Sequence, residues 1–266
     1  MISRRGFSKG LGLGAGVTAA SLAGVRGASA APRGEVGARP GGASAATPGT
    51  TSTAAPRATP TFPRLKRIDA GLLHVAYAEL GPAHGPVVIC LHGWPYDIHS
   101  YVDVAPLLAE QGYRVIVPYL RGHGPTRFRS ALTFRNGQQS AIATDIVALM
   151  DALKIEKAVL AGFDWGSRTA DIIAALWPDR CKALVSVSGY LITNLEANQK
   201  PLAPAAERTW WYQYYFSTER GRRAMEDKAL RHDLTRFVWD TVSPTWDFDD
   251  ATFERTAAAF DNPDYA

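Results

Sequence analysis

The sequence predicts an α/β domain in which a mostly parallel sheet is flanked by helices. Short apolar runs rich in β-branched residues alternate with segments whose apolar residues recur at helical spacing. Gly and Pro separate these runs. In addition, a Gly-x-Asp-x-Gly turn at residues 162–166 joins one apolar run directly to one helical segment. Alternating strands and helices need crossover connections, so the strands are expected to run parallel.

Length and composition allow one large α/β domain with an insertion, or two small domains. The chain has 266 residues, of which 46% are hydrophobic, and a formal net charge of +4. The positive balance is mild, and no basic stripe carries interleaved aromatic residues, so nucleic acid is not an expected partner. We expect no metal and no cofactor. The two cysteines, Cys90 and Cys181, are expected to be small buried apolar residues, and their positions give a disulfide no support.

Residues 1–30 carry the parts of a bacterial export signal in the usual order. The run SRRGFSK at positions 3–9 resembles the twin-arginine (Tat) motif, a Gly/Ala-rich apolar run covers 11–25, and a small-x-small cleavage site falls at 28–30. The apolar run is short and glycine-rich for a membrane span. These features predict export by the twin-arginine translocase to the periplasm or the outside of the cell. A chance arginine pair in a disordered tail is the alternative.

A disordered linker is predicted at residues 31–62. This stretch is rich in Ala, Pro, Gly, Ser and Thr and has almost no large apolar residue, so it cannot bury enough surface to offset the entropy of ordering. The folded domain is therefore expected to begin near Phe62 or Pro63, with its core part over residues 63–190.

The elements of the core follow in order along the chain. Two short strands are predicted within residues 68–80, with a turn near 69–71. Further strands are predicted at 87–91, 114–119, 158–161 and 183–187, and helices at 101–111, 140–153 and 167–177.

Asp164 is the candidate nucleophile. The turn at 162–166 needs glycine at both ends, because a Cβ at Gly162 or Gly166 would collide with its neighbours. The residue between them is held in a strained conformation with its side chain above the sheet. A carboxylate there suits displacement at a saturated carbon, which gives an alkyl ester that water then cleaves. The alternative is an ordinary turn in which Asp164 caps the helix.

Three motifs in order resemble those of the epoxide hydrolase and haloalkane dehalogenase branch of the α/β-hydrolases. They are H-G-W-P at 92–95, R-G-x-G at 121–124 and G-x-D-W-G at 162–166. The resemblance covers about residues 63–266. It implies an α/β-hydrolase fold with a mostly helical cap, here residues 191–266, inserted after the strand at 183–187. It also implies catalysis by Asp164 with a histidine and a second acid.

The loop His92-Gly93-Trp94-Pro95 is expected to supply half of an oxyanion hole. In this fold one donor is a backbone N–H of this loop and the other is the N–H after the nucleophile, which implies the amides of Trp94 and Trp165. These amides would hold the carboxylate of Asp164 for attack and later stabilise the tetrahedral intermediate. For the side chain of His92 we expect a structural role.

The cap region is aromatic-rich, with its densest run at 210–216. This run resembles an epoxide hydrolase pattern in which a tyrosine precedes Gln-x-Tyr-Phe, and the match falls on Tyr212. Opening an epoxide leaves an alkoxide, for which a phenol is a suitable proton donor. We expect Tyr214 and Tyr215 to be core residues, and the same role is the alternative for Tyr212. The aromatic cap suggests a small apolar substrate.

The resemblance implies opening of an epoxide through an ester of Asp164, followed by hydrolysis to a diol. Haloalkane dehalogenases share Asp164 and Trp165, whose indole N–H could bind halide, but one subgroup places an acid where this chain reads SVSGY at 186–190. A fluoroacetate dehalogenase would have an arginine in place of Trp165. A non-catalytic binding protein of the same fold is the third alternative.

No histidine stands where the resemblance requires one, beyond the cap. Five of the six histidines precede the turn at 162–166, and His232 lies in the cap region. We therefore expect a fragment that lacks turnover because the last core strands, the catalytic histidine, its acid and a second cap tyrosine are missing. A chain that evolved without them is less favoured, because its sheet would keep an exposed apolar edge.

Overall fold

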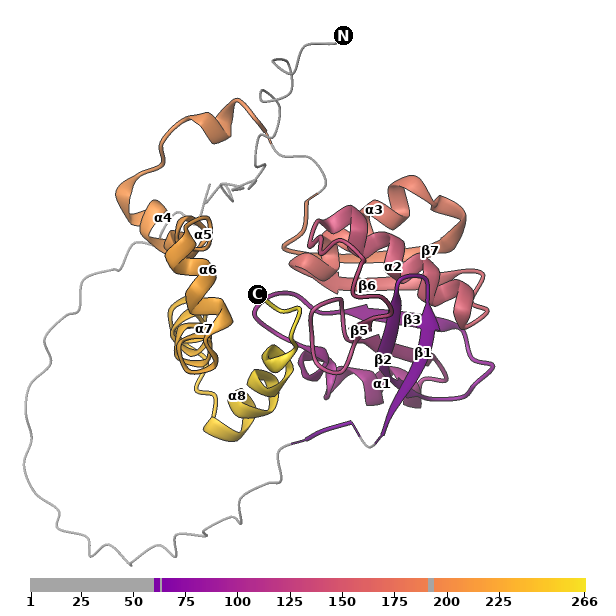
Figure 1. The fold of residues 1–266 in the computed structure, drawn as a ribbon. Coiled ribbons are helices and arrows are strands. Elements are labelled where there is room, and N and C mark those ends of the chain that lie inside the picture. The colour runs from indigo at the N-terminus through magenta and orange to yellow at the C-terminus, as the bar shows by residue number, and fades with distance from the viewer. Residues whose placement is uncertain (1–59, 63, 191–193) are drawn as a thin grey trace, which may run out of the picture.

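The computed structural model describes residues 60–62, 64–190 and 194–266. The predicted export signal, and the predicted linker apart from residues 60–62, lie outside these ranges. Within them the chain forms a seven-stranded sheet flanked by helices, with a group of helices to one side (Figure 1). None of the helices in these ranges combines the length and the apolar character that spanning a bilayer requires.

The elements alternate much as predicted. The strands are β1 Leu65–Ala70, β2 Leu73–Leu80, β3 Val87–Leu91, β4 Arg114–Pro118, β5 Arg127–Phe128, β6 Ala158–Phe163 and β7 Cys181–Val187. The helices are α1 Val104–Glu110, α2 Gln139–Ala152, α3 Trp165–Leu176, α4 Pro204–Thr209, α5 Trp211–Phe216, α6 Glu219–Glu226, α7 Lys228–Val242 and α8 Asp250–Ala257. Four short 3₁₀ turns are also described, at Ile98–Tyr101, Pro178–Arg180, Ala197–Gln199 and Ala258–Asp261.

The sheet is mixed, and its parallel half brings two predicted motifs together. The strand order is β1-β2-β4-β3-β6-β7, and β5 pairs with β2. β1, β2 and β4 pair antiparallel, whereas β3 pairs parallel with β4 and β6, and β6 with β7. Leu91 at the end of β3 lies opposite Gly162. The H-G-W-P loop after β3 is therefore next to the Gly-x-Asp-x-Gly turn after β6.

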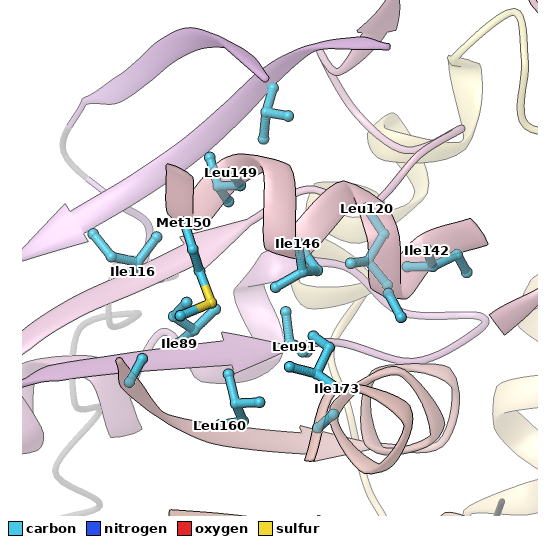
Figure 2. Packing of buried hydrophobic residues seen from close by; sticks show 14 of the residues in the cluster. Ile89, Leu91, Ile116, Leu120, Ile142, Ile146, Leu149, Met150, Leu160 and Ile173 are labelled. Atoms are coloured by element: carbon cyan, nitrogen blue, oxygen red, sulfur yellow. The ribbon is translucent and has the colours of Figure 1, made fainter. Parts of the chain in front are cut away.

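One face of the sheet is covered by α2 and α3. Along α2 the buried side chains recur at helical spacing, as the sequence predicts, and they pack on strand residues such as Ile89 and Leu160 (Figure 2). The buried apolar residues of α2 are Ile142, Ala143, Ile146, Leu149 and Met150. Burying this stripe holds α2 against the sheet.

The other face is covered by α1 together with the last helical segment of the chain. Phe253 and Phe260, from α8 and the turn after it, are buried in the same cluster as strand residues of β3 and β4. Asn262 also donates from Nδ2 to the carbonyl oxygens of Gly124 (3.0 Å) and Thr126 (2.7 Å). The predicted cap at 191–266 is helical in its described part, but the segment from α8 onward packs as part of the core.

β7 is an edge strand in the described part of the sheet. Leu184, Val185 and Val187 are apolar and exposed, so the strand shows uncovered apolar residues on both faces. Such a strand is typical of the middle of a parallel sheet. The exposed apolar edge that the sequence suggests is therefore present at β7.

Several predicted boundaries differ from the structure: for example, β1 begins at Leu65 rather than at 68, and β7 at Cys181 rather than at 183. The helix predicted at 101–111 begins only at Val104, because Asp97 starts a separate 3₁₀ turn by accepting a hydrogen bond from the N–H of His99 (3.0 Å). Phe62 is buried in the core rather than part of a linker, and its ring centroid lies 5.8 Å from that of His99.

Both cysteines are free thiols, with Cys90 buried and Cys181 half-buried.

Trp239 links α7 to the loop after β3. Its side chain is 1% exposed and its indole N–H donates to the carbonyl oxygen of Pro95 at 2.8 Å. Trp239→Ala is expected to lower the free energy of unfolding by about 3–5 kcal/mol, because it leaves a large cavity and an unpaired buried carbonyl. Chemical denaturation measures this loss. On the same helix, Phe237 is 52% exposed, so Phe237→Ala should cost about 1 kcal/mol or less; equal losses would contradict the packing role of Trp239.

Candidate active site

Asp164 occupies a sharp turn between β6 and α3. β6 ends at Phe163 and α3 begins at Trp165, so a single residue reverses the direction of the chain. Asp164 has φ of 50° and ψ of −118°. A residue with a side chain pays about 1–3 kcal/mol to hold such a conformation. The conformation directs the carboxylate out of the sheet, where it is 30% exposed.

Three glycines make room for this turn. A Cβ on Gly166 would lie 2.0 Å from the carbonyl oxygen of Leu91, and one on Gly162 would lie 2.4 Å from the backbone of Gly166. A Cβ on Gly93 would lie 2.6 Å from the Cβ of Asp164. All three distances are shorter than any real contact, so β3, β6 and α3 approach closely only because these positions lack side chains.

The carboxylate of Asp164 has two described contacts. Oδ1 accepts a hydrogen bond from the backbone N–H of Trp94 at 3.0 Å. Oδ2 lies 3.4 Å from Nη2 of Arg168, one turn along α3. The amide of Trp165, which the sequence nominates as a second donor, makes no described hydrogen bond to this side chain. The structure therefore brings Trp94 and Asp164 together, and leaves the Trp165 amide at the start of α3 without that contact.

His92 and Pro95 fix the loop that carries the Trp94 amide. His92 is fully buried; its Nδ1 donates to the carbonyl oxygen of Gly93 (3.1 Å), and its Nε2 accepts from the N–H of Leu120 (3.2 Å). These two bonds require the neutral ring, and burial lowers the pKa of His92 further. The imidazole thus links the end of β3 to the end of β4, which is a structural role, and Pro95 accepts the bond from Trp239.

Tyr212 lies on α5, close to the loop after β3. Its ring centroid is 5.4 Å from that of Trp94 and 6.1 Å from that of Phe216, and its side chain is half-buried. Burial is the main cause that raises the pKa of the Tyr212 phenol, with the Asp164 carboxylate raising it further and Arg168 opposing. The phenol is therefore protonated at neutral pH. Tyr214 is 51% exposed, so the prediction that it is a core residue is wrong, whereas Tyr215 is half-buried against Trp211.

Two residues near Asp164 were not predicted from the sequence. Arg168 contacts its carboxylate, and the signal for it was the spacing of four residues on one helix. Tyr96, directly after the H-G-W-P loop, stacks on Trp239 with ring centroids 4.8 Å apart and packs edge-on against Phe163. Burial raises the pKa of Tyr96, and the Asp164 carboxylate adds to the rise. No sequence pattern marked Tyr96, because its place depends on a helix far along the chain.

A cavity of about 550 Å³ lies behind Tyr96 and Phe163, away from the Asp164 carboxylate. Trp246 and Phe248 form part of its apolar wall, and charged side chains, among them Asp247 and Arg255, also line it. Neither Asp164 nor Tyr212 lines it, so this cavity is not the space above the candidate nucleophile.

None of the six histidines, all of which lie in the described ranges, makes a hydrogen bond to Asp164. Several have other partners: His99 donates from Nδ1 to Oδ2 of Asp97 (2.8 Å), His232 pairs with Glu254 (2.7 Å), and His74 pairs with Asp69. His123 bonds the carbonyl oxygen of Arg121 (3.0 Å). A general base for water is therefore not among the described contacts of Asp164.

Comparison with known proteins identifies the family of this site. The profile described as alpha/beta hydrolase fold matches residues 86–263. The chain belongs to the α/β-hydrolase fold family. The predicted fold class is thus confirmed, and the relatives of this α/β-hydrolase place it in the epoxide hydrolase and haloalkane dehalogenase branch.

The relatives include both activities of that branch. A proposed epoxide hydrolase from Klebsiella pneumoniae is 59% identical, and its crystal structure superposes with a TM-score of 0.73 over 78% of this chain and 68% of that one. Epoxide hydrolase B of Mycobacterium tuberculosis is 33% identical over 172 residues, which are 60% of this chain and 47% of that protein. A haloalkane dehalogenase of Mycobacterium marinum is 33% identical over 129 residues, covering 47% and 41%. The chain spans about half the length of the curated relatives that it matches.

Proposed function

We propose that this protein opens epoxides by forming an ester with Asp164. The observation that carries the proposal is the carboxylate at the strained turn, with Oδ1 bound by the amide of Trp94 and Oδ2 in only a long contact with Arg168. A carboxylate in this place is a nucleophile for a saturated carbon rather than for an acyl group. The similarity to epoxide hydrolases favours the epoxide as the electrophile.

The contacts suggest how the first step runs. Oδ2 of Asp164 forms a bond to a ring carbon while the ring C–O bond breaks, and the electron pair remains on the substrate oxygen. The Tyr212 phenol then donates its proton to that alkoxide. Oδ1 becomes the carbonyl oxygen of the ester, so the Trp94 amide already points at the atom that would carry negative charge when water attacks.

The second step needs a base for water, and no histidine contacts Asp164 in the described ranges. We therefore expect the ester to accumulate in this chain. The test is incubation with styrene oxide, followed by intact-mass measurement and peptide mapping. One persistent adduct on Asp164 is expected. A folded chain without an adduct would favour a non-catalytic binding protein, and continued diol formation would show that another group, such as His99 or His232, supplies the base.

Tyr212→Phe is expected to slow adduct formation by about 10²-fold, because the alkoxide loses its proton donor. Hydrolysis of a preformed ester should change much less, since no alkoxide forms in that step. Rapid mixing with styrene oxide measures the first rate. The matched control is Tyr214→Phe, whose hydroxyl bonds Glu207 at the surface rather than facing Asp164. Equal rates for wild type and Tyr212→Phe would assign Tyr212 to packing alone.

Displacement of halide from a haloalkane is the second candidate, because the same branch contains haloalkane dehalogenases. Both reactions use the carboxylate of Asp164 as a nucleophile, but a departing halide needs only N–H donors. The indole of Trp165 would supply one. Incubation with a chloroalkane separates the two: halide release without any reaction with epoxides would favour the dehalogenase.

We also propose that the protein is exported by the twin-arginine translocase, because of the motif at 3–9 and the cleavage site at 28–30. Replacing Arg4 and Arg5 together by Lys is expected to leave precursor in the cytoplasm, since the translocase recognises the arginine pair. Cell fractionation with immunoblotting measures this. Processing and export of the double variant at the wild-type level would contradict the proposal.

A further inference from the structure

Arg168 faces the same space as the nucleophile. It follows Asp164 by four residues, so both side chains lie on one face at the start of α3. Its Nη2 is 3.4 Å from Oδ2 of Asp164, and its side chain is 15% exposed. The guanidinium therefore borders the oxygen of Asp164 that is proposed to attack the substrate.

The hydrogen-bonding capacity of this guanidinium is largely unused. Its Nε is buried and has no hydrogen-bond partner within the described ranges, so a ligand would meet the two Nη groups. Of these, Nη2 makes a contact with Asp164 that is long for a charged hydrogen bond, and Nη1 makes no described hydrogen bond. The buried guanidinium of Arg121 is different: Nε and Nη2 bind the two oxygens of Asp145 at 2.6 and 2.7 Å, and backbone carbonyls take further donors. Leaving a buried donor unpaired is unfavourable. Arg168 is thus suited to accept a further anionic partner.

Aromatic rings hold this guanidinium in place. Its central carbon lies 4.8 Å from the ring centre of Trp165 and 4.2 Å from that of Tyr190. Contacts of this kind stabilise a cation over a ring face and limit rotation of the long side chain. The group is consequently oriented before a ligand arrives, which reduces the entropy lost on binding.

Orienting Asp164 does not by itself account for Arg168. The carboxylate is already held by the Trp94 amide at 3.0 Å, whereas the arginine contact is longer and engages one nitrogen. A second anion beside Asp164 would be repelled by its negative charge, unless a fixed cation stood between them. A guanidinium with free donors in this position satisfies that requirement.

We propose that Arg168 binds a carboxylate of the substrate, so that the preferred substrates are epoxides with an acid group next to the ring. This inference rests on the proposed epoxide chemistry. The aromatic residues favour a substrate that is mostly apolar, and the inference adds one carboxylate to that substrate. The reacting carbon must touch Oδ2 of Asp164 while the acid reaches Arg168, which restricts the acid to one or two bonds from the ring. The carboxylate itself is unchanged when the ester with Asp164 forms.

Glycidate and glycidamide test this inference because they differ almost only in charge. Adduct formation at Asp164, followed by mass spectrometry, is expected to be at least about 10-fold faster with glycidate. Arg168→Gln should slow the reaction with glycidate by about 10²-fold and leave glycidamide within about threefold. Arg168→Lys should fall between, since it keeps the charge and loses the planar pair of donors. Arg223→Gln, which removes an exposed arginine, is the matched control.

Any other result with these probes would overturn either the role of Arg168 or the epoxide chemistry. Equal loss with both probes in Arg168→Gln would make Arg168 a positioning residue for Asp164 and end the proposal, as would equal rates with both probes in the wild type. Reaction of neither probe would contradict the epoxide chemistry. Carboxylate binding can be tested independently of the reaction. In titrations followed by the NMR signal of the Arg168 Nε proton, propionate should shift the signal and propionamide should not. Absence of a propionate-specific shift would refute carboxylate binding whatever the reaction.

Discussion

Asp164→Asn is expected to abolish adduct formation with styrene oxide, lowering the rate by roughly 10³-fold or more, because an amide oxygen is a far weaker nucleophile than a carboxylate. The side chain keeps its shape, and its oxygen still accepts the bond from the Trp94 amide. Fold and thermal midpoint should therefore change little. Intact-mass measurement after exposure to the epoxide gives the result directly.

A second variant separates the chemistry of Asp164 from the strain at its position. Asp164→Gly removes the nucleophile and also relieves the positive φ of 50°, so it should be inactive and more stable by about 1 kcal/mol. Adduct formation that persists in Asp164→Asn would show that another side chain is alkylated and would refute the assignment of the nucleophile.

Gly166→Ala is expected to cost more than about 4 kcal/mol of stability, because the added methyl group overlaps backbone atoms in the core. The added Cβ would stand 2.0 Å from the carbonyl oxygen and 2.4 Å from the carbonyl carbon of Leu91. Both atoms belong to the backbone at the end of β3, which cannot move without breaking its pairing with β6. Soluble yield and denaturation with urea measure the loss.

Gly137→Ala is the control for this variant. No atom of the described ranges lies within 4 Å of a Cβ at Gly137, so this change should be within about 0.5 kcal/mol of the wild type. A Gly166→Ala protein that folds as well as Gly137→Ala would mean that α3 does not approach β3 as closely as the contact with Leu91 requires.

Local patterns predicted the parts of the fold in which neighbours along the chain determine the outcome. The apolar stripe of α2 and the buried run of β3 follow directly from residue spacing. The steric demand on Gly162 and Gly166 likewise follows from the turn itself. The pairing of β3 with β6 then places the Trp94 amide against Asp164. The main contact of the candidate site could therefore also be predicted from the sequence.

Features that depend on distant contacts were not predictable in this way. The spacing of α8 shows an apolar side but not which surface it meets, and that side packs on the core rather than on a separate cap. Tyr96 owes its place to Trp239, which lies far along the chain. The sequence places Arg168 one helical turn from Asp164, but its contact with the ring of Tyr190, 4.2 Å from the guanidinium carbon, depends on a residue beyond β7.

The edge strand β7 bears directly on how firmly the nucleophile is held. The backbone N–H of Asp164 donates to the carbonyl oxygen of Val187 at 2.9 Å, at the very end of β7. Edge strands fray more readily than strands paired on both sides, because opening them breaks one ladder instead of two. When the end of β7 opens, the strained turn loses a bond that helps to keep φ positive, and Asp164 is free to relax. A strand paired with this edge of β7 would accordingly hold the strained turn at Asp164 more firmly.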